Sequence, residues 1–278
     1  MSATLRKAAV AGTWYPGTAD ALAREVDRYL AGASGAAAPG RLVALISPHA
    51  GLRYSGPVAA YGYSLLRGRS ALTAVLVGPS HRAAFRGIAV QARGEWETPL
   101  GRVSVDEATT EALLAAGEGL VFDDPGVHRQ EHSLEMQMPF LQRLVPSLRI
   151  VPLMMGSQSR EEVAGLGDAL ARALAGRDVL LVASSDLSHF EPAPVANRLD
   201  AVVVDQVSRF DDDALLSRLE RHENVACGGG PIVAVMRAAR ALGADHATVL
   251  KYADSGDVAG DKSQVVGYLS AALTASGS

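Results

Sequence analysis

The hydrophobic pattern of the chain predicts short buried strands that alternate with amphipathic helices. Four apolar runs are nearly continuous: Leu42–Ile46, Ala74–Val77, Ile150–Met154 and Val179–Ala183. Strands that are covered on both faces have this pattern, as in sheets with helices on either side. Two later apolar runs, Thr248–Tyr252 and Gln264–Leu269, predict strands on either side of a loop near the C-terminus.

Helical spacing of apolar residues marks the segments between these strands. We expect helices at Asp20–Leu30, Val58–Leu66, Asp106–Ala116, Glu161–Ala175, Leu199–Arg209 and Pro231–Leu242. The run Asp211–Asp213 is typical of a helix N-cap followed by an acidic first turn. This alternation predicts an α/β fold: one layered domain over residues 1–278, with a central, largely parallel or mixed sheet and helices on both faces.

Composition excludes several classes of function. The chain is 48% hydrophobic and 20% charged, which is typical of a globular protein. Its formal net charge is −4 with no basic stripe, so we expect no nucleic-acid partner. We find neither a signal peptide nor an apolar run long enough to cross a membrane, and therefore expect no membrane association. A single cysteine, Cys227, fits the reducing cytoplasm and is available for packing or chemistry.

Three of the predicted strands end in short polar loops that carry a histidine. His49 follows the first apolar run, His81 follows the second, and Asp186 and His189 follow the fourth. Ligands of open α/β sheets bind beyond the carboxyl ends of the strands. If these strands are parallel neighbours, the four side chains converge on one pocket.

Two of these histidines suggest part of a metal site. A neutral imidazole is a good ligand for zinc, iron or copper, and a carboxylate, a third histidine or a thiolate would complete the set. Cys227 is a candidate because it lies just ahead of the helix predicted at Pro231, whose N-terminus favours a thiolate. The alternative interpretation is that His49 and His81 are hydrogen-bonded loop residues and that Cys227 is a small core residue.

A second metal pattern competes with this one. His128 to His132 form H-x-x-E-H, the inverted zinc-peptidase motif, in which Glu131 would act as the base. The Asp-Pro-Gly just before it indicates a loop or a first turn at His128, followed by a helix over Glu131–Leu144 that is interrupted or bent near its proline. There His132 and Glu135 either pin the helix by hydrogen bonds or form the rim of the pocket.

Two aromatic residues lie close to these motifs. Trp14, in an aromatic turn near the N-terminus, is either a plug on the core or a wall of the pocket. Tyr54 follows His49 closely and either orients a ligand or is a buried structural hydroxyl. His222 and His246 have no evident partner in the sequence, and we interpret both as structural or exposed.

Taken together, these motifs resemble the Memo family, whose bacterial and archaeal members are also called AmmeMemoRadiSam system protein B. The resemblance is carried by Ala11–Pro16, Ser47–Gly51, Tyr54–Gly56, Gly78–His81, Glu131–Glu135, Ser184–His189 and Cys227–Gly228, and it covers a core of about residues 6–271. It implies a fold similar to that of class III extradiol ring-cleaving dioxygenases, whose non-haem iron is held by two histidines and a carboxylate.

The resemblance also implies a ligand set and an ion. His49, His81 and Cys227 match the metal ligands, with the cysteine where the dioxygenases have the carboxylate. We expect one divalent transition metal, iron(II) first, with copper or zinc as alternatives. Copper has the highest intrinsic affinity of the three, so cellular supply decides which is bound.

Other matched residues surround these ligands. Asp186 and His189 match catalytic pocket residues, and His189 stands where the dioxygenases have an acid/base, a role that its unperturbed pKa suits. We expect Asp186 to orient His189 or to bind a water on the metal. Trp14 and Tyr54 match positions near the pocket mouth, and we expect them, with His132, to contact the substrate.

These expectations leave more than one function open. The first is a metal-dependent redox or dioxygenase-related enzyme that acts on an unidentified small molecule or peptide. The second is a non-enzymatic binding or scaffold protein that uses the same pocket for a peptide or for metal delivery. A zinc metallopeptidase that uses His128, Glu131 and His132 is a third. The resemblance further implies a functional association with a radical SAM protein and an AMMECR1-like protein.

Overall fold

The structure is a computed structural model that describes residues 4–221 and 225–277. Its strands are β1 Leu5–Arg6, β2 Arg41–Ser47, β3 Ala71–Pro79, β4 Ile88–Val90, β5 Glu95–Thr98, β6 Gly101–Val105, β7 Val121–Asp123, β8 Ser147–Met155, β9 Val179–Ser184, β10 His189–Glu191, β11 His246–Asp254 and β12 Val265–Ala275. Its helices are α1 Ala19–Gly32, α2 Leu52–Tyr63, α3 Glu107–Ala116, α4 Met138–Leu144, α5 Arg160–Leu174, α6 Ala193–Ser208, α7 Asp212–Leu219, α8 Gly229–Ala241 and α9 Gly256–Ala259, with short 3-10 helices η1 Ser64–Leu66 and η2 Glu135–Gln137. Strands and helices thus alternate along most of the chain, as expected for an α/β fold.

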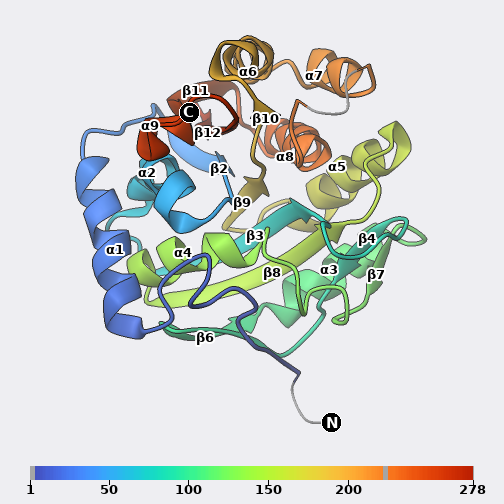
Figure 1. The fold of residues 1–278 in the computed structure, drawn as a ribbon. Coiled ribbons are helices and arrows are strands. Elements are labelled where there is room, and N and C mark those ends of the chain that lie inside the picture. Colours follow the sequence, from blue (N-terminus) through green and yellow to red (C-terminus); the bar gives the residue numbers. More distant parts are fainter. Residues whose placement is uncertain (1–3, 222–224, 278) are drawn as a thin grey trace.

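One mixed sheet contains the strands of the described residues (Figure 1). The strand order is β1-β5-β6-β8-β3-β9-β2-β12-β10, with β11 paired to β12, β4 paired to β8 and β7 paired to β4. From β6 through β8, β3 and β9 to β2 the strands are parallel, and β12 runs antiparallel to β2. The carboxyl ends of β3, β9 and β2 therefore lie side by side.

Two apolar layers cover the two faces of this sheet (Figure 1). On one face lie α1, α2 and α4, whose Leu22, Val26 and Leu141 belong to one core cluster. On the other face lie α3, α5, α6 and α8, with Leu166 and Val233 in a second cluster. Because both sides of the central strands are shielded from water, their sequences are apolar without alternation.

Most of the predicted elements are confirmed. The four continuous apolar runs form β2, β3, β8 and β9, the two later runs form β11 and β12, and each segment with helical spacing contains a helix. Asp211 caps α7 as its sequence predicts, because its side chain accepts the main-chain N–H of Ala214 at 2.9 Å. No helix within residues 4–221 and 225–277 is long and apolar enough to cross a membrane. The expectation of one domain over residues 1–278 stays a prediction.

Three predicted helix boundaries are wrong. The helix expected from Leu199 begins earlier, at Ala193, directly after Pro192. The helix expected from Val58 begins at Leu52 and contains Pro57. The prediction starts too late because the first turn includes the exposed Arg53 and Tyr54 and so lacks an apolar period. The helix expected over 131–144 exists only as η2 and α4, since residues 131–134 lie outside any helix. The segment is interrupted near its proline, as one of the two expected alternatives has it, because η2 ends and α4 begins there. The proline stands in the first turn of α4, where its missing N–H has no cost.

Candidate metal centre

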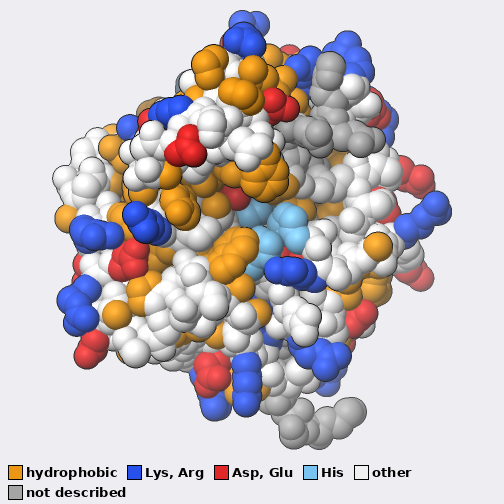
Figure 2. Space-filling view, in the orientation of Figure 1, with side chains coloured by type: hydrophobic (Ala, Val, Ile, Leu, Met, Phe, Trp, Pro, Cys, Tyr) orange, Lys and Arg blue, Asp and Glu red, His pale blue; other side chains and the backbone are white. Residues whose placement is uncertain are grey.

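Three adjacent strand ends bring the predicted residues together. In the sheet, β9 lies between β3 and β2. His49 follows β2, His81 follows β3 and Asp186 follows β9, so the predicted convergence of these loops is confirmed. Figure 2 shows histidine side chains that reach the surface together at the centre of one face, between hydrophobic side chains.

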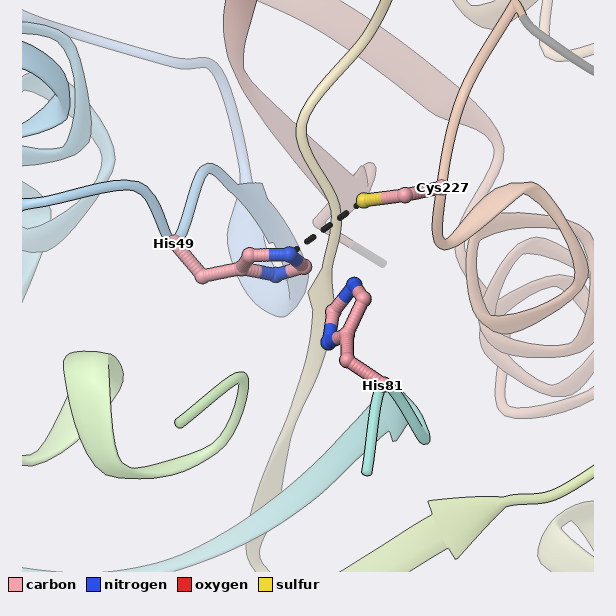
Figure 3. A group of neighbouring side chains, drawn as sticks. All are labelled: His49, His81 and Cys227. Carbon is pink, nitrogen blue, oxygen red and sulfur yellow. Dashed lines mark hydrogen bonds between the residues drawn. The ribbon is translucent and has the colours of Figure 1, made fainter. Parts of the chain in front are cut away.

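Three ligand atoms meet at this point. A ring nitrogen of His49, a ring nitrogen of His81 and the thiol of Cys227 all lie within 4.8 Å of one another. Figure 3 shows the three side chains pointing toward a common centre from three separate segments. We refer to His49, Ser184, Asp186 and Cys227 as the deep half of the site, and to His81, Glu131, His132 and Trp14 as the outer half.

The hydrogen bonds of His49 determine which of its ring nitrogens is free. Ser184 donates its hydroxyl proton to the main-chain oxygen of Ser133 at 2.7 Å and accepts an N–H of Gln137 at 2.7 Å. His49 Nδ1, 2.9 Å from the Ser184 oxygen, must therefore donate, and Nε2 carries no proton. Burial lowers the pKa of His49 well below its usual range, so the ring is neutral. This is the form of imidazole that binds a metal ion.

Cys227 lies directly beside His49, with Sγ 3.2 Å from Nε2. Its main-chain N–H donates to the oxygen of Asp186 at 3.2 Å, and the N–H of Gly228 donates to the Ser185 hydroxyl at 2.9 Å. Burial, and then the charge of Asp186, raise the pKa of the thiol. Burial of the thiol thus opposes the thiolate form that we expected the start of α8 to favour. A cation that binds here must displace the thiol proton.

Asp186 supports the loop that carries His49. Its Oδ1 accepts the main-chain N–H groups of His49 at 2.7 Å and Ala50 at 3.2 Å. Burial raises the pKa of Asp186 to about 7, although these two hydrogen bonds act in the opposite direction. Asp186 does not orient His189, because His189 Nδ1 donates to the oxygen of Leu187 at 2.8 Å. The alternative, that Asp186 binds a water on the metal, stays a prediction.

Glu131 orients His81 in the outer half. Its Oε1 lies 3.0 Å from His81 Nδ1, and its Oε2 accepts the main-chain N–H of His81. The same carboxylate accepts the N–H groups of His132 at 2.8 Å and Ser133 at 3.0 Å. Burial alone would raise the pKa of Glu131, but these hydrogen bonds lower it below its usual range, so the group is ionised. His81 Nδ1 is therefore a donor, and its Nε2 faces the centre (Figure 3).

His132 and Trp14 form a wall beside His81. The ring of His132 stacks on that of His81 with centroids 4.6 Å apart, and lies 4.2 Å from the ring of Trp14. Its Nδ1 is 3.1 Å from Glu131 Oε1, without hydrogen-bond geometry. Burial lowers the pKa of His132 to about 4. Both side chains lie where we expected substrate contacts, and that role stays a prediction.

His189 and Tyr54 lie less deeply. His189 is half-buried, and burial lowers its pKa. Because its Nδ1 donates to Leu187, Nε2 is the nitrogen that can exchange a proton with a substrate. Tyr54, in the first turn of α2, is 36% exposed, so it is not a buried structural hydroxyl. The catalytic role of His189 and the substrate contact of Tyr54 stay predictions.

The H-x-x-E-H segment does not form the helix that a zinc peptidase of this type requires. Residues 124–134 contain no helix, so its two histidines do not share a helix face. The ring of His128 is fully buried against Trp96, with centroids 5.6 Å apart. Glu131 serves His81 instead of a peptidase zinc. This alternative is therefore wrong.

The two other histidines take no part in the site described. His246 begins β11, and its Nδ1 lies 2.8 Å from a carboxylate oxygen of the adjacent Asp245. It is exposed as expected, but it does have a partner. His222 lies outside the described residues.

A cavity of about 340 Å³ adjoins Cys227. Gln158, Leu216, Leu219 and Gly230 line it together with the cysteine. A larger cleft, of about 750 Å³, lies beside the start of α5 and contains none of the predicted site residues. The candidate centre is thus identified by its ligand atoms and not by the size of a cleft.

The donor set fits one divalent transition-metal ion. Imidazole nitrogen and thiolate sulfur are ligands of zinc, iron and copper sites. Two such ligands of one ion lie about 3 to 3.5 Å apart, and the 3.2 Å between Cys227 Sγ and His49 Nε2 is in this range. Each histidine holds its other nitrogen against an oxygen acceptor, as in established metal sites. Three protein ligands leave room for a substrate.

Sequence comparisons find relatives over almost the whole chain. The family model described as Memo-like protein matches residues 6–272. The chain belongs to the Memo-like family. This Memo-like protein is 39% identical over 267 residues to a MEMO1 family protein of Methanosarcina mazei, an alignment that covers 95% of this chain and 97% of the relative. It is 37% identical over 273 residues to a MEMO1 family protein of Methanothermobacter thermautotrophicus, with 95% and 98% covered.

A solved structure shares the fold. The crystal structure of an uncharacterized protein from Escherichia coli K12 matches this Memo-like protein with a TM-score of 0.58 and 17% identity, over 84% of this chain and all of the other. Identity at this level shows the fold alone. The expected α/β class, with its mixed sheet and helices on both faces, is confirmed, as is the Memo resemblance.

Sequence reasoning missed most of the residues that orient the ligands. Ser184 stood within a strand-end motif but received no role, and Glu131 was interpreted only as a peptidase base. Gln137 was placed in a helix without a function. The available signal was position alone, since each lies within or next to a motif that carries a histidine.

Proposed function

We propose that this protein binds one divalent transition-metal ion through His49, His81 and Cys227 and uses it in redox chemistry on a small molecule. Iron(II) is the first candidate, and copper and zinc are the alternatives. The proposal is carried by the meeting of three donor atoms within 4.8 Å, two of them on histidines whose Nδ1 is already hydrogen-bonded. When bound, the ion would supply Lewis acidity and, as iron or copper, electron transfer. The reducing cytoplasm, which keeps a lone thiol free, suits this site.

The side chains around the ligands supply proton transfer and orientation. His189 keeps a proton on Nδ1, and its Nε2 accepts a proton from the substrate or returns it. Burial lowers the pKa of His189, so the ring is neutral and able to accept a proton at neutral pH. The rings of His132 and Trp14, which are tilted by 48° with centroids 4.2 Å apart, offer an aromatic wall against which a planar substrate group can be held.

A binding role is the second candidate, and exposed aromatic side chains favour it. Phe190, next to His189, is 69% exposed and has a left-handed backbone with φ 62°. Such a conformation is unfavourable for a bulky residue and is found mainly at functional sites. Phe190 and Tyr54 would then contact a peptide, or a partner such as the radical SAM or AMMECR1-like protein that the family resemblance implies.

Metal content tests the proposal. Protein purified anaerobically is incubated with iron(II), copper or zinc, desalted, and analysed by inductively coupled plasma mass spectrometry. We expect about one equivalent in the wild type, loss in His49→Ala and Cys227→Ser, and full content in the matched control His246→Ala. Absence of bound metal under every loading condition contradicts the proposal.

Oxygen consumption with catechols and thiols separates the two candidate functions. Turnover that falls in His189→Ala while the metal content is unchanged supports the enzyme. Full metal content without turnover of any substrate, together with tight binding of a partner, supports the binding role.

A further inference from the structure

The N-terminal segment is joined to the metal centre by one buried ion pair. Arg6 of β1 pairs with Glu135 of η2, and the two side chains are only 1% and 0% exposed. Two charges are costly to bury unless further hydrogen bonds satisfy them. The partners of those hydrogen bonds show what this pair holds in place.

Arg6 holds the segment that carries Glu131. Its Nε donates to the main-chain oxygen of His128 at 3.0 Å, and its Nη2 donates to the main-chain oxygen of Glu131. The guanidinium also lies over the ring of Trp96, 4.4 Å from its centroid. Glu131 in turn binds both the main-chain N–H and Nδ1 of His81. Arg6 is therefore two contacts away from a predicted metal ligand.

Glu135 holds the segment that carries Trp14. Its carboxylate accepts the main-chain N–H groups of Ala9 at 2.8 Å and Val10 at 3.1 Å, and the hydroxyl of Tyr15. The N–H of Trp14 donates to the oxygen of Val10 at 2.9 Å. Trp14 is thus fixed on both sides by groups that Glu135 binds.

We propose that Arg6 and Glu135 are positioning residues of the metal centre. Through Glu131 they set the orientation of His81, and through the N-terminal segment they place Trp14 against His132. The residues that hydrogen-bond to Arg6 and Glu135 all lie, along the chain, within four residues of Glu131 or within six residues of Trp14. The inference rests on the proposed function, because it assigns these two residues to the same site.

Cobalt(II) tests this role because its absorption bands report thiolate and imidazole ligation. Glu135→Gln preserves the size of the side chain and removes its charge. We expect the cobalt affinity of this variant, when circular dichroism shows it folded, to fall about 10- to 100-fold. Glu97→Gln is the matched control, since it makes the same substitution in an exposed ion pair with Arg102, and we expect unchanged affinity.

Two measurements without cobalt report positioning directly. In the wild type, nitrogen-15 NMR should show His81 only with its proton on Nδ1, and in Glu135→Gln it should show both tautomers. The fluorescence of Trp14, identified by difference from Trp14→Phe, should shift to longer wavelength in Glu135→Gln. A merely structural role would leave the tautomer of His81 unchanged in a folded variant.

Unchanged affinity together with an unchanged tautomer in folded Glu135→Gln overturns the proposal. If this variant does not fold, Tyr15→Phe takes its place, because it removes one hydrogen bond to Glu135 and leaves the ion pair. We expect it to weaken cobalt binding about 3- to 10-fold, and unchanged binding and spectra overturn the proposal equally. If the wild type binds neither cobalt nor iron(II), copper or zinc, the proposed function fails, and the tautomer and fluorescence measurements alone decide the positioning role.

Discussion

The deep and outer halves of the site hold their histidines by different means. In the deep half, Ser184 and Asp186 bind His49 from the end of β9, the strand directly beside β2. In the outer half, His81 Nδ1 is held by the carboxylate of Glu131, fifty residues away in sequence. The main-chain oxygen of Glu131 in turn accepts a hydrogen bond from Arg6. Adjacent strands thus position His49, whereas a series of buried side-chain contacts positions His81.

The two histidine ligands also differ in exposure. The side chain of His49 is 2% exposed, and that of His81 is 29% exposed. We therefore expect both halves to hold the metal, each support in proportion to the contacts that it makes with its histidine, and the more exposed outer half to admit the substrate. The predictions below test this division, from the largest expected effect to the smallest.

Gly228→Ala should damage the deep half most. A Cβ at this position would lie 2.3 Å from the main-chain oxygen of Ser184 and 2.8 Å from Cβ of Ser185, so the loop that carries Cys227 must move. We expect the free energy of unfolding to fall by about 2–3 kcal/mol and metal affinity to fall roughly 100-fold or more. Denaturant unfolding and zinc titration measure the two effects.

Gly32→Ala is the matched control for this substitution. Nothing lies within 4 Å of the Cβ that it would add at the end of α1, so we expect a change within about 0.5 kcal/mol. If Gly228→Ala binds metal as tightly as the wild type does, the observed position of the Cys227 loop is not required for metal binding.

Glu131→Gln and Ser184→Ala compare the supports of the two histidines. Glu131 is charged and binds both the ring and the main chain of His81, whereas Ser184 makes one neutral contact with His49 Nδ1. We expect metal affinity to fall about 100-fold in Glu131→Gln and about 10-fold in Ser184→Ala. Chelator competition measures both, and the reverse order would invalidate the comparison.

Low pH should destabilise the folded protein because His128 is buried and neutral. Burial, and then the charge of Arg6, lower the pKa of His128 to about 3, whereas an unfolded histidine has a pKa of about 6.5. Between these values only the unfolded chain binds the proton, so stability is lost as the pH falls from about 6.5 to 3. In this window, His128→Phe should reduce the dependence of the unfolding free energy on pH by about 1.4 kcal/mol per pH unit.

Denaturant unfolding at a series of pH values measures this slope. His246→Phe is the control, because the side chain of His246 is 58% exposed, and we expect it to leave the slope unchanged. Parallel stability curves for the wild type and His128→Phe would contradict the buried, neutral state of His128.

Tyr54→Ala should have the smallest effect. The side chain is 36% exposed, and no hydrogen bond within residues 4–221 and 225–277 joins it to either half. We expect a change in stability within about 0.5 kcal/mol and unchanged metal affinity by zinc titration. A tenfold loss of affinity would place Tyr54 inside the metal centre instead of at its mouth.

The meeting of three strand ends was accessible from the sequence because its cause is local. A continuous apolar run followed at once by a histidine or an aspartate marks the end of a buried strand, and parallel strands place such ends on one edge. His49, His81 and Asp186 could therefore be predicted to converge. The order β3-β9-β2 could not be predicted, since pairing depends on packing between distant segments.

The outer half was accessible only in part, because its supports are distant in sequence and irregular in structure. Arg6 and Glu131 are separated by 125 residues, and the turns before η2 follow no hydrophobic period. Helical spacing after Glu131 therefore led to a helix that starts too early. The short strands β4 to β7 were missed for a related reason, since runs of three to five residues carry little periodicity.

Anomalous X-ray diffraction from crystals of anaerobically prepared, iron-loaded protein tests the central claim most directly. Data collected on either side of the iron absorption edge should show one peak within bonding distance of His49 Nε2, His81 Nε2 and Cys227 Sγ. The absence of a peak at that point, or a peak held by other side chains, would contradict the proposed metal centre.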